Sequence, residues 1–157
     1  MSAARILYKK YVQNTEKEAK IVLQRVFLCN IKKSLRKIID KDKSCNTRSV
    51  YLSTKALKHV YDRHVYDKNT PEDFAIILEN ITNILKYPDK LFKNLVAKRG
   101  DILFVKEINQ RLYYCSIEIA MGETGQSIEI VSLTITGEKY LKKFTLLWSW
   151  RTATPPS

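Results

Sequence analysis

The clearest structural signal in this sequence is the stretch of residues 102–120, ILFVKEINQRLYYCSIEIA. Polar and apolar residues alternate on either side of Asn109-Gln110, a pattern typical of two half-buried strands joined by a tight turn. Gly122-Glu-Thr-Gly125 predicts a second, looser hairpin. With two later runs of the same period, an antiparallel meander of four strands is expected at Ile102–Ile108, Leu112–Ala120, Ser127–Thr136 and Phe144–Arg151.

Two helices are predicted before these strands, over residues 53–66 and 71–86. Val50-Tyr-Leu52 is a short strand, and Ser53 after it is a suitable N-cap for the first helix. Thr70-Pro71 is a suitable start for the second, which ends at Tyr87-Pro88. Helices that precede an antiparallel sheet define an α+β fold, with N-terminal helices packed on a C-terminal four-stranded antiparallel β-sheet.

The first third of the chain gives weaker signals. Residues 1–20 are compatible with a helix or a mobile arm, and residues 20–31 with a buried strand or part of a helix. Apolar residues at helical spacing predict a helix over residues 31–39, followed by a solvated loop at 40–46. We expect an N-terminal extension over residues 1–48 and a main domain over 49–157, together forming one compact domain.

The chain is strongly basic. Its 28 Lys and Arg residues against 16 Asp and Glu give a net charge of +12 and a pI near 9.6. This excess favours a polyanionic partner such as RNA, because basic groups set against phosphates release condensed counterions. The plainer alternative is that the charge serves solubility alone. The basic residues are not gathered on one amphipathic helix, so no membrane partner is expected.

Cysteine usage and the N-terminus indicate a reducing compartment. Cys29, Cys45 and Cys115 are odd in number and form no CxxC pair, so neither a disulfide framework nor a zinc site is indicated. The first residues lack the apolar stretch of a secretory signal. We expect a cytoplasmic protein, or one delivered into a target cell as an effector.

Several kinds of catalytic site are excluded by their missing motifs. The chain has four glycines and no glycine-rich phosphate loop. It also has no HExxH motif and no cluster of carboxylates able to hold two magnesium ions. We therefore expect a site with no metal and no cofactor.

The two histidines of the chain, His59 and His64, lie in the predicted helix 53–66. At about 100° per residue, His64 shares the inward face with Leu57, Val60 and Tyr61, whereas His59 points to the opposite side. Imidazole exchanges protons near neutral pH, so His64 held against the sheet is a candidate general base. The plainer alternative is a structural histidine in the core.

Alternation also assigns the two faces of the predicted sheet. One face carries Tyr113, Cys115, Ile117 and Ile119, with Val131, Leu133 and Ile135 on the next strand. The opposite face carries a row of hydroxyls and other polar groups at Tyr114, Ser116, Glu118, Ser132, Thr134 and Thr136. Lys106 is in phase with the apolar row of Ile102, Phe104 and Ile108. The hydroxyl row is a candidate working surface, and the alternative is a solvated outer face.

The order of these features resembles a known superfamily. The matching segments are YLSTKALKHVYDRH at 51–64, ILKYP at 84–88, FVK at 104–106 and SLTIT at 132–136. They resemble the barnase–EndoU–colicin–RelE-like nuclease superfamily, and more narrowly its phage-associated branch. The resemblance covers residues 49 to 151. The fold that it implies, helices before a four-stranded antiparallel sheet, agrees with the pattern of the chain.

The resemblance implies metal-independent cleavage of RNA. A base would take the proton of a ribose 2′-OH, which attacks the adjacent phosphate, and an acid would protonate the leaving oxygen. The catalytic positions map onto His64, His59, Lys106 and a strand hydroxyl, Thr136 or Thr134. The segment LWSWRTA at 147–153 departs from the family pattern, and no family catalytic residue aligns there.

Further residues are candidates for binding the substrate: Arg151, Trp150, Lys58, Arg63 and Ser53. Arg151 would clamp a phosphate, and Trp148 or Trp150 would stack on a base. The alternative for the two tryptophans is packing in the core.

The function expected from the sequence is an endoribonuclease of toxin or effector type that cleaves tRNA or mRNA. An acidic immunity protein or antitoxin is an expected partner, because a free ribonuclease endangers its host. Two alternatives remain, a non-catalytic nucleic-acid-binding domain and a phage or mobile-element accessory protein.

Overall fold

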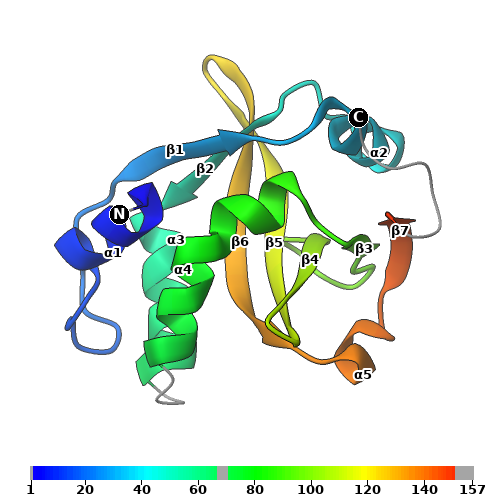
Figure 1. Ribbon diagram of the computed structural model, residues 1–157. Helices are drawn as coiled ribbons and strands as arrows, with labels where there is room; N and C mark the ends of the chain where they lie inside the picture. The colour runs from blue at the N-terminus through cyan, green and yellow to red at the C-terminus, as the bar shows by residue number, and fades with distance from the viewer. Residues whose placement is uncertain (1, 67–70, 151–157) are drawn as a thin grey trace.

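The computed structural model describes residues 2–66 and 71–150, apart from the side chains at 64–66 and 71–73. Its seven strands form one sheet in the order β1-β2-β6-β5-β4-β3-β7 (Figure 1). The elements are α1 (Ala3–Tyr11), β1 (Arg25–Asn30), α2 (Lys33–Asp42), β2 (Ser49–Ser53), α3 (Thr54–Val60), the π-helical turn η1 (Tyr61–Tyr66), α4 (Pro71–Lys86), β3 (Lys90–Lys93), β4 (Ile102–Ile108), β5 (Arg111–Gly122), β6 (Gly125–Thr136), α5 (Glu138–Leu141) and β7 (Thr145–Ser149).

The α+β class is confirmed, but the prediction of a four-stranded antiparallel sheet is wrong. β4, β5 and β6 form the predicted antiparallel meander. β7 does not pair with β6, because it crosses to the far side of the sheet and pairs with β3. β1 and β2 extend the other side, and β2 runs parallel to β6, which makes the sheet mixed. β3 has four residues, too few for its alternation to be recognised.

Both predicted hairpins exist. Asn109 and Gln110 have φ angles of 51° and 67°, as a two-residue turn with both central residues in the left-handed region requires. The second hairpin is tighter than predicted, because Gly122 and Gly125 are themselves paired across the strands.

A β-bulge changes which residues of β6 face the helices. Ser116 pairs with Ser132, but the next residue, Ile117, pairs with Ile130. The extra residue is Val131, so its predicted place in one row with Leu133 is wrong. Past the bulge the predicted phase holds: Leu133 packs in the core, and the hydroxyl row of β6 lies on the opposite face of the sheet from Leu133.

The predicted helices are confirmed in position, with one change in geometry. Ser53 caps α3 by accepting a hydrogen bond from the backbone N–H of Ala56 (3.1 Å). The α-helix ends at Val60 and continues as η1, in which the spacing of about 100° per residue no longer applies. α4 ends at Lys86, just before Pro88. Thr70, the predicted cap of α4, lies outside the described residues.

The N-terminal third of the chain is part of the same sheet. The ambiguous segment 20–31 contains β1, which pairs with β2, and residues 1–20 contain α1. α2 continues to Asp42, so the predicted loop at 40–46 starts later than expected, and Cys45 in it is fully buried. Lys93 of β3 binds Asp42 of α2 through an ion pair of 2.6 Å.

The sheet has a hydrophobic cluster on each face. The larger cluster lies under the helices and includes Leu57, Leu78, Phe104, Cys115 and Leu133. The smaller cluster lies on the opposite face, which we call the outer face, and contains Phe92, Leu103, Val105 and Leu141 with Leu112, Tyr114 and Phe144 packed against them. α5 therefore covers part of the outer face, as Figure 1 shows at the lower edge of the sheet.

Gly100 is required by both its backbone and its surroundings. Its φ is +65°, and a Cβ added there would lie 2.9 Å from Ser116 Oγ and 3.0 Å from Val131 Cβ. We expect Gly100→Ala to lower the free energy of unfolding by about 1–3 kcal/mol, the usual cost of a strained backbone position. Gly137→Ala is the control, because nothing lies within 4 Å of its added Cβ and its φ is −126°. Equal denaturation midpoints for the two variants would contradict this account.

In the described part of the chain, no helix is long and apolar enough to cross a membrane.

Candidate active site

The position of His59 depends on which residues of β6 pair with β2. β2 pairs with β6 only at Val50–Ile128 and Tyr51–Glu129, so the later half of β6 has no strand on its β2 side. The chain leaves β2 directly into α3, which contacts β6. α3 therefore runs along this edge of β6, and side chains on one side of α3 reach the outer face of the sheet.

A pocket of about 520 Å³ lies where α3, η1 and the outer face of the sheet meet. We call it the hydroxyl pocket. Its lining combines an imidazole, a guanidinium and several hydroxyls: His59, Arg63, Tyr114, Ser132, Thr134, Ile135, Thr136, Gly137 and Tyr140. His59 of α3 and Arg63 of η1 are both exposed, and both line this pocket.

Two tyrosines form one wall of the hydroxyl pocket. The rings of Tyr114 and Tyr140 are nearly parallel, with centroids 6.3 Å apart. Phe144 packs edge-on against Tyr140, and Lys143 Nζ lies 5.4 Å from the centre of that ring. Burial, followed by the influence of Tyr140, raises the pKa of Tyr114, although Arg63 and a hydrogen bond with Ser132 oppose the rise. Tyr114 is therefore a neutral phenol near pH 7.

Thr136 supplies an unsatisfied polar atom. Its Oγ1 is buried and makes no hydrogen bond to any of the described residues. Such a group costs stability unless it serves another purpose.

Residues 28–132, two thirds of the chain, match the family described as phage-Barnase-EndoU-ColicinE5/D-RelE like nuclease3. The chain belongs to this nuclease family. The resemblance inferred from short motifs is thereby confirmed, including its phage-associated branch. Comparison with curated proteins and with solved structures found no match.

The nuclease brings four of its predicted site residues together in the hydroxyl pocket: His59, Arg63, Thr134 and Thr136. His64 was predicted to be the histidine held against the sheet, and the histidine that lines the hydroxyl pocket is His59. His59 lies on the opposite side of the helix from Leu57 and Val60, as expected, and that side faces the outer face of the sheet. The side chain of His64 lies outside the described residues.

Lys106 lies on the other side of the sheet from the hydroxyl pocket. It pairs with Tyr113, and Tyr113 faces the helices in the same row as Cys115. Its Nζ donates to the carbonyl oxygen of Tyr87 (2.8 Å) and lies 3.9 Å from Asp89 Oδ1. The prediction that Lys106 shares a face with the apolar row is thus confirmed. Lys106 therefore lies on the opposite face of the sheet from Thr134 and Thr136.

Two predicted substrate-binding residues have structural partners instead. Lys58 is 7% exposed, and its ammonium donates to Asp62 Oδ1 and to Thr15 Oγ1, both at 2.8 Å. The Ser53 hydroxyl caps α3.

The remaining substrate-binding candidates lie at the C-terminal end of the nuclease. Trp148 is 7% exposed and packs in the core, whereas Trp150 is 44% exposed and lines a second pocket. Arg151 lies outside the described residues.

Sequence reasoning missed Tyr140 as a site residue. Residues 137–143 contain α5, and Gly137 and Tyr140 of this segment line the hydroxyl pocket. One signal was available, because Tyr140, Leu141 and Phe144 have the spacing of an amphipathic helical turn. Tyr114 and Ser132 belonged to the predicted hydroxyl row but were not singled out.

Metal-ligating residues are not gathered in the described part of the nuclease, which has no group of three or more His, Cys, Asp or Glu side chains placed to hold a metal ion.

Proposed function

We propose that this nuclease is a metal-independent endoribonuclease that cleaves RNA by attack of a ribose 2′-OH on the adjacent phosphate. The observation that supports this most strongly is that His59 and Arg63 line one pocket together with the hydroxyl row of β6 and β5. The pocket thus offers one group that exchanges protons near neutral pH and one permanent cation that matches a phosphate in shape.

The proposed reaction needs one base and one proton donor. His59 takes the proton of the 2′-OH, the 2′ oxygen forms a bond to phosphorus, and the bond from phosphorus to the 5′ oxygen breaks. Tyr114, a neutral phenol with a raised pKa, donates its proton to the leaving oxygen, and the phenolate regains a proton from water while the His59 imidazolium gives up the proton it took. The products are a 2′,3′-cyclic phosphate and a 5′-hydroxyl end.

The phosphate gains negative charge at its outer oxygens as the new bond forms. In this proposal Arg63 binds these oxygens, and Thr134 and Thr136, which line the same pocket, donate hydrogen bonds to them. Groups already oriented toward developing charge stabilise a transition state more than they stabilise the substrate.

A toxin or effector role is part of the same proposal, as are tRNA or mRNA as the target and an acidic inhibitor as partner. The phage-associated family and the resemblance to a superfamily named after barnase, colicins and RelE support it.

Expression of the nuclease should arrest growth of a bacterial host, whereas expression of the His59→Ala variant should not. Equal growth with both chains would contradict a toxin role.

Incubation with RNA in EDTA separates catalysis from simple binding. The proposal predicts shortened RNA in EDTA at a rate equal to that without chelator. Retarded RNA that stays intact would instead indicate a non-catalytic nucleic-acid-binding domain. RNA that is neither cleaved nor retarded would contradict both of these functions and favour an accessory protein.

RNA binding is expected to weaken steeply with salt. A chain with a net charge of +12 that contacts several phosphates of single-stranded RNA should show a log–log slope of about −0.7 per phosphate contacted. Fluorescence anisotropy of a non-cleavable 2′-deoxy oligonucleotide, titrated between about 50 and 200 mM salt, measures this slope. An affinity that does not change over this range of salt concentration would show that charge is not the basis of RNA binding.

A further inference from the structure

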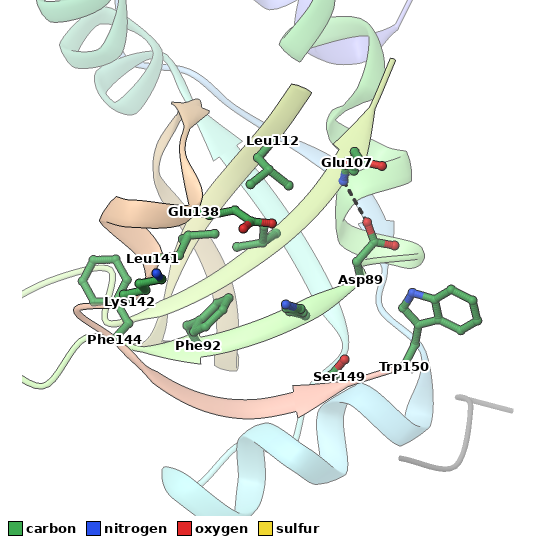
Figure 2. Close-up of a pocket in the computed structure, with 12 residues that line it drawn as sticks. Asp89, Phe92, Glu107, Leu112, Glu138, Leu141, Lys142, Phe144, Ser149 and Trp150 are labelled. Atoms are coloured by element: carbon green, nitrogen blue, oxygen red, sulfur yellow. Dashed lines mark hydrogen bonds between the residues drawn. The ribbon is translucent and has the colours of Figure 1, made fainter. Parts of the chain in front are cut away.

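The outer face of the sheet continues past the hydroxyl pocket in two directions. On one side, beyond Tyr140 and Leu141 of α5, lies the second pocket of about 360 Å³, which Figure 2 shows between the strands and α5. On the other side lie the first half of β6 and, beyond it, β2 and β1. A strand of RNA that leaves the hydroxyl pocket on this other side therefore crosses β2 and β1.

Four side chains gather on the outer face where β1, β2 and β6 lie side by side, and we call them the stacking cluster. They are Arg25 and Phe27 of β1, Tyr51 of β2 and Glu129 of β6. Their neighbours along each strand pack in the core under the helices: Val26, Leu28, Val50, Leu52, Ile128 and Ile130. Because successive residues of a strand point to opposite faces, the stacking cluster lies on the same face as the hydroxyl pocket.

Arg25 is held as a flat plate in the middle of the stacking cluster. Its Nε and Nη2 donate to the two carboxylate oxygens of Glu129, at 3.1 and 2.8 Å. The central carbon of its guanidinium lies 3.6 Å from the centre of the Tyr51 ring. The ion pair and the ring contact together fix the orientation of the guanidinium plane before any ligand arrives.

The stacking cluster stays open to solvent although it is well ordered. The side chain of Arg25 is 47% exposed. Phe27 packs edge-on against Tyr51, with ring centres 5.7 Å apart, and is itself 48% exposed. Bases of single-stranded RNA stack on aromatic rings and on guanidinium planes, so Arg25 and Phe27 present the two kinds of surface on which a base stacks.

A lysine lies between the stacking cluster and the hydroxyl pocket. Lys55 follows Ser53, the strand partner of Arg25, by two residues. It precedes His59 by one turn of α3, and both side chains are exposed. Residues four apart in a helix share one side, so Lys55 is placed to bind a phosphate on the way from His59 to Arg25.

The carboxylates on this part of the outer face are neutralised. Glu129 and Glu118 are strand partners, and each is paired with an arginine, Arg25 in one case and Arg99 in the other. With these pairs in place, Lys55 makes the charge along the route positive. This charge favours a polyanion such as RNA over an acid-repelling or neutral role for the surface.

The stacking cluster is near enough to the hydroxyl pocket to share one strand of RNA with it. Glu129 precedes Ser132, which lines the pocket, by three residues of β6, a distance of about 10 Å. Phe27 lies two strands away from Glu129, which adds about 10 Å across the sheet. Binding sites for single-stranded nucleic acid commonly cover several nucleotides, as this distance requires.

We propose that the stacking cluster is a second RNA-binding surface, on which a base a few nucleotides from the cleaved phosphate stacks. This inference rests on the proposed function, because it takes RNA as the substrate. The base lies on the guanidinium of Arg25 beside the ring of Phe27, and Lys55 binds a phosphate between the two sites. Every base has a flat face, so this surface adds affinity for single-stranded RNA without selecting its sequence.

Binding of 2′-deoxy oligonucleotides tests this surface without cleavage. Fluorescence anisotropy should show that Phe27→Ala binds a single strand of about twelve nucleotides roughly tenfold more weakly than the wild-type protein, the loss of one stacked base. A dinucleotide, which reaches only the hydroxyl pocket, should bind both proteins equally. Ile6→Ala is the matched control, because Ile6 is 52% exposed on α1, which packs under the sheet on the helix side, and it should change neither affinity.

A double variant separates stacking from charge. Arg25→Gln with Glu129→Gln removes one positive and one negative charge, so the net charge stays at +12 and no ion loses its partner. This protein should also bind the longer strand roughly tenfold more weakly, with an unchanged log–log slope against salt. Wild-type affinity in the folded double variant and in folded Phe27→Ala would overturn the proposal and leave the cluster as an anchor of β1.

Cleavage kinetics separate this surface from the reaction. With long RNA, both variants should raise KM roughly tenfold and leave kcat unchanged, because stacking stabilises the substrate and the transition state equally. Slower cleavage of a dinucleotide would show that the variants disturb the hydroxyl pocket, and would contradict a separate surface. Long RNA cleaved normally by both variants would overturn the surface and leave the proposed function standing. Binding that depends on the cluster in a protein that never cleaves RNA would do the reverse.

Discussion

The His59→Ala variant is expected to lose at least about 100-fold of the RNA-cleaving activity, the lower end of what a general acid or base contributes. His59 lines the hydroxyl pocket with Arg63 and Thr134, and its imidazole is exposed. Because an exposed side chain contributes little to packing, the variant should melt at nearly the same temperature as the wild-type protein. Initial rates of RNA cleavage measured beside thermal melts check both parts.

Two parallel variants locate the chemistry. Lys106→Ala should keep most of the activity, because Lys106 lies on the helix-covered face of the sheet. His64→Ala tests the histidine that the sequence favoured. A folded His59→Ala protein with undiminished cleavage, together with a large loss in His64→Ala or Lys106→Ala, would place the reaction outside the hydroxyl pocket.

The Asp62→Ala variant should lower the free energy of unfolding by about 3–5 kcal/mol, the cost of breaking a buried ion pair from one side. Asp62 and Lys58 are 9% and 7% exposed, and their charged groups are 2.8 Å apart. Asp62 Oδ2 also accepts from the backbone N–H of Glu18 (3.0 Å). The change would therefore leave a buried ammonium without its counter-ion and remove the hydrogen bond that joins Glu18 to η1.

Chemical denaturation measures this loss. Lys55→Ala, an exposed position on the same helix, is the matched control and should change the free energy of unfolding by about 0.5 kcal/mol or less. Replacing both partners, as in Lys58→Met with Asp62→Leu, should recover much of the loss, because no charge remains buried. An Asp62→Ala protein as stable as the control would show that the pair is solvated.

Local patterns in the sequence predicted the elements that depend on neighbouring residues. Ser53 caps α3, and Asn109-Gln110 turns between β4 and β5, because each feature depends on a few side chains near it in the chain. Period-two alternation placed β4, β5 and β6 in the correct order. It could not show that β7 pairs with β3, nor that β2 lies parallel to β6, because those partners are far apart in the sequence.

Only part of the candidate site was predicted, because local patterns again gave no information on contacts between distant segments. The hydroxyls of Thr134 and Thr136 follow from alternation within one strand. The choice between His59 and His64 depends on where α3 lies beside β6, and the parallel pairing of β2 with β6 sets that position. The π-helical turn at Tyr61–Tyr66 also ends the regular helical spacing on which the preference for His64 rested.

The chemistry of the cleaved ends tests the proposed reaction most directly. An RNA oligonucleotide and a copy with a single 2′-deoxynucleotide at the cleaved position are incubated with the nuclease in EDTA, and the products are weighed by mass spectrometry. The account predicts a 2′,3′-cyclic phosphate and a 5′-hydroxyl from the RNA, and no cleavage at the deoxy position. Cleavage at the deoxy position, or a 5′-phosphate end, would contradict attack by the 2′-OH.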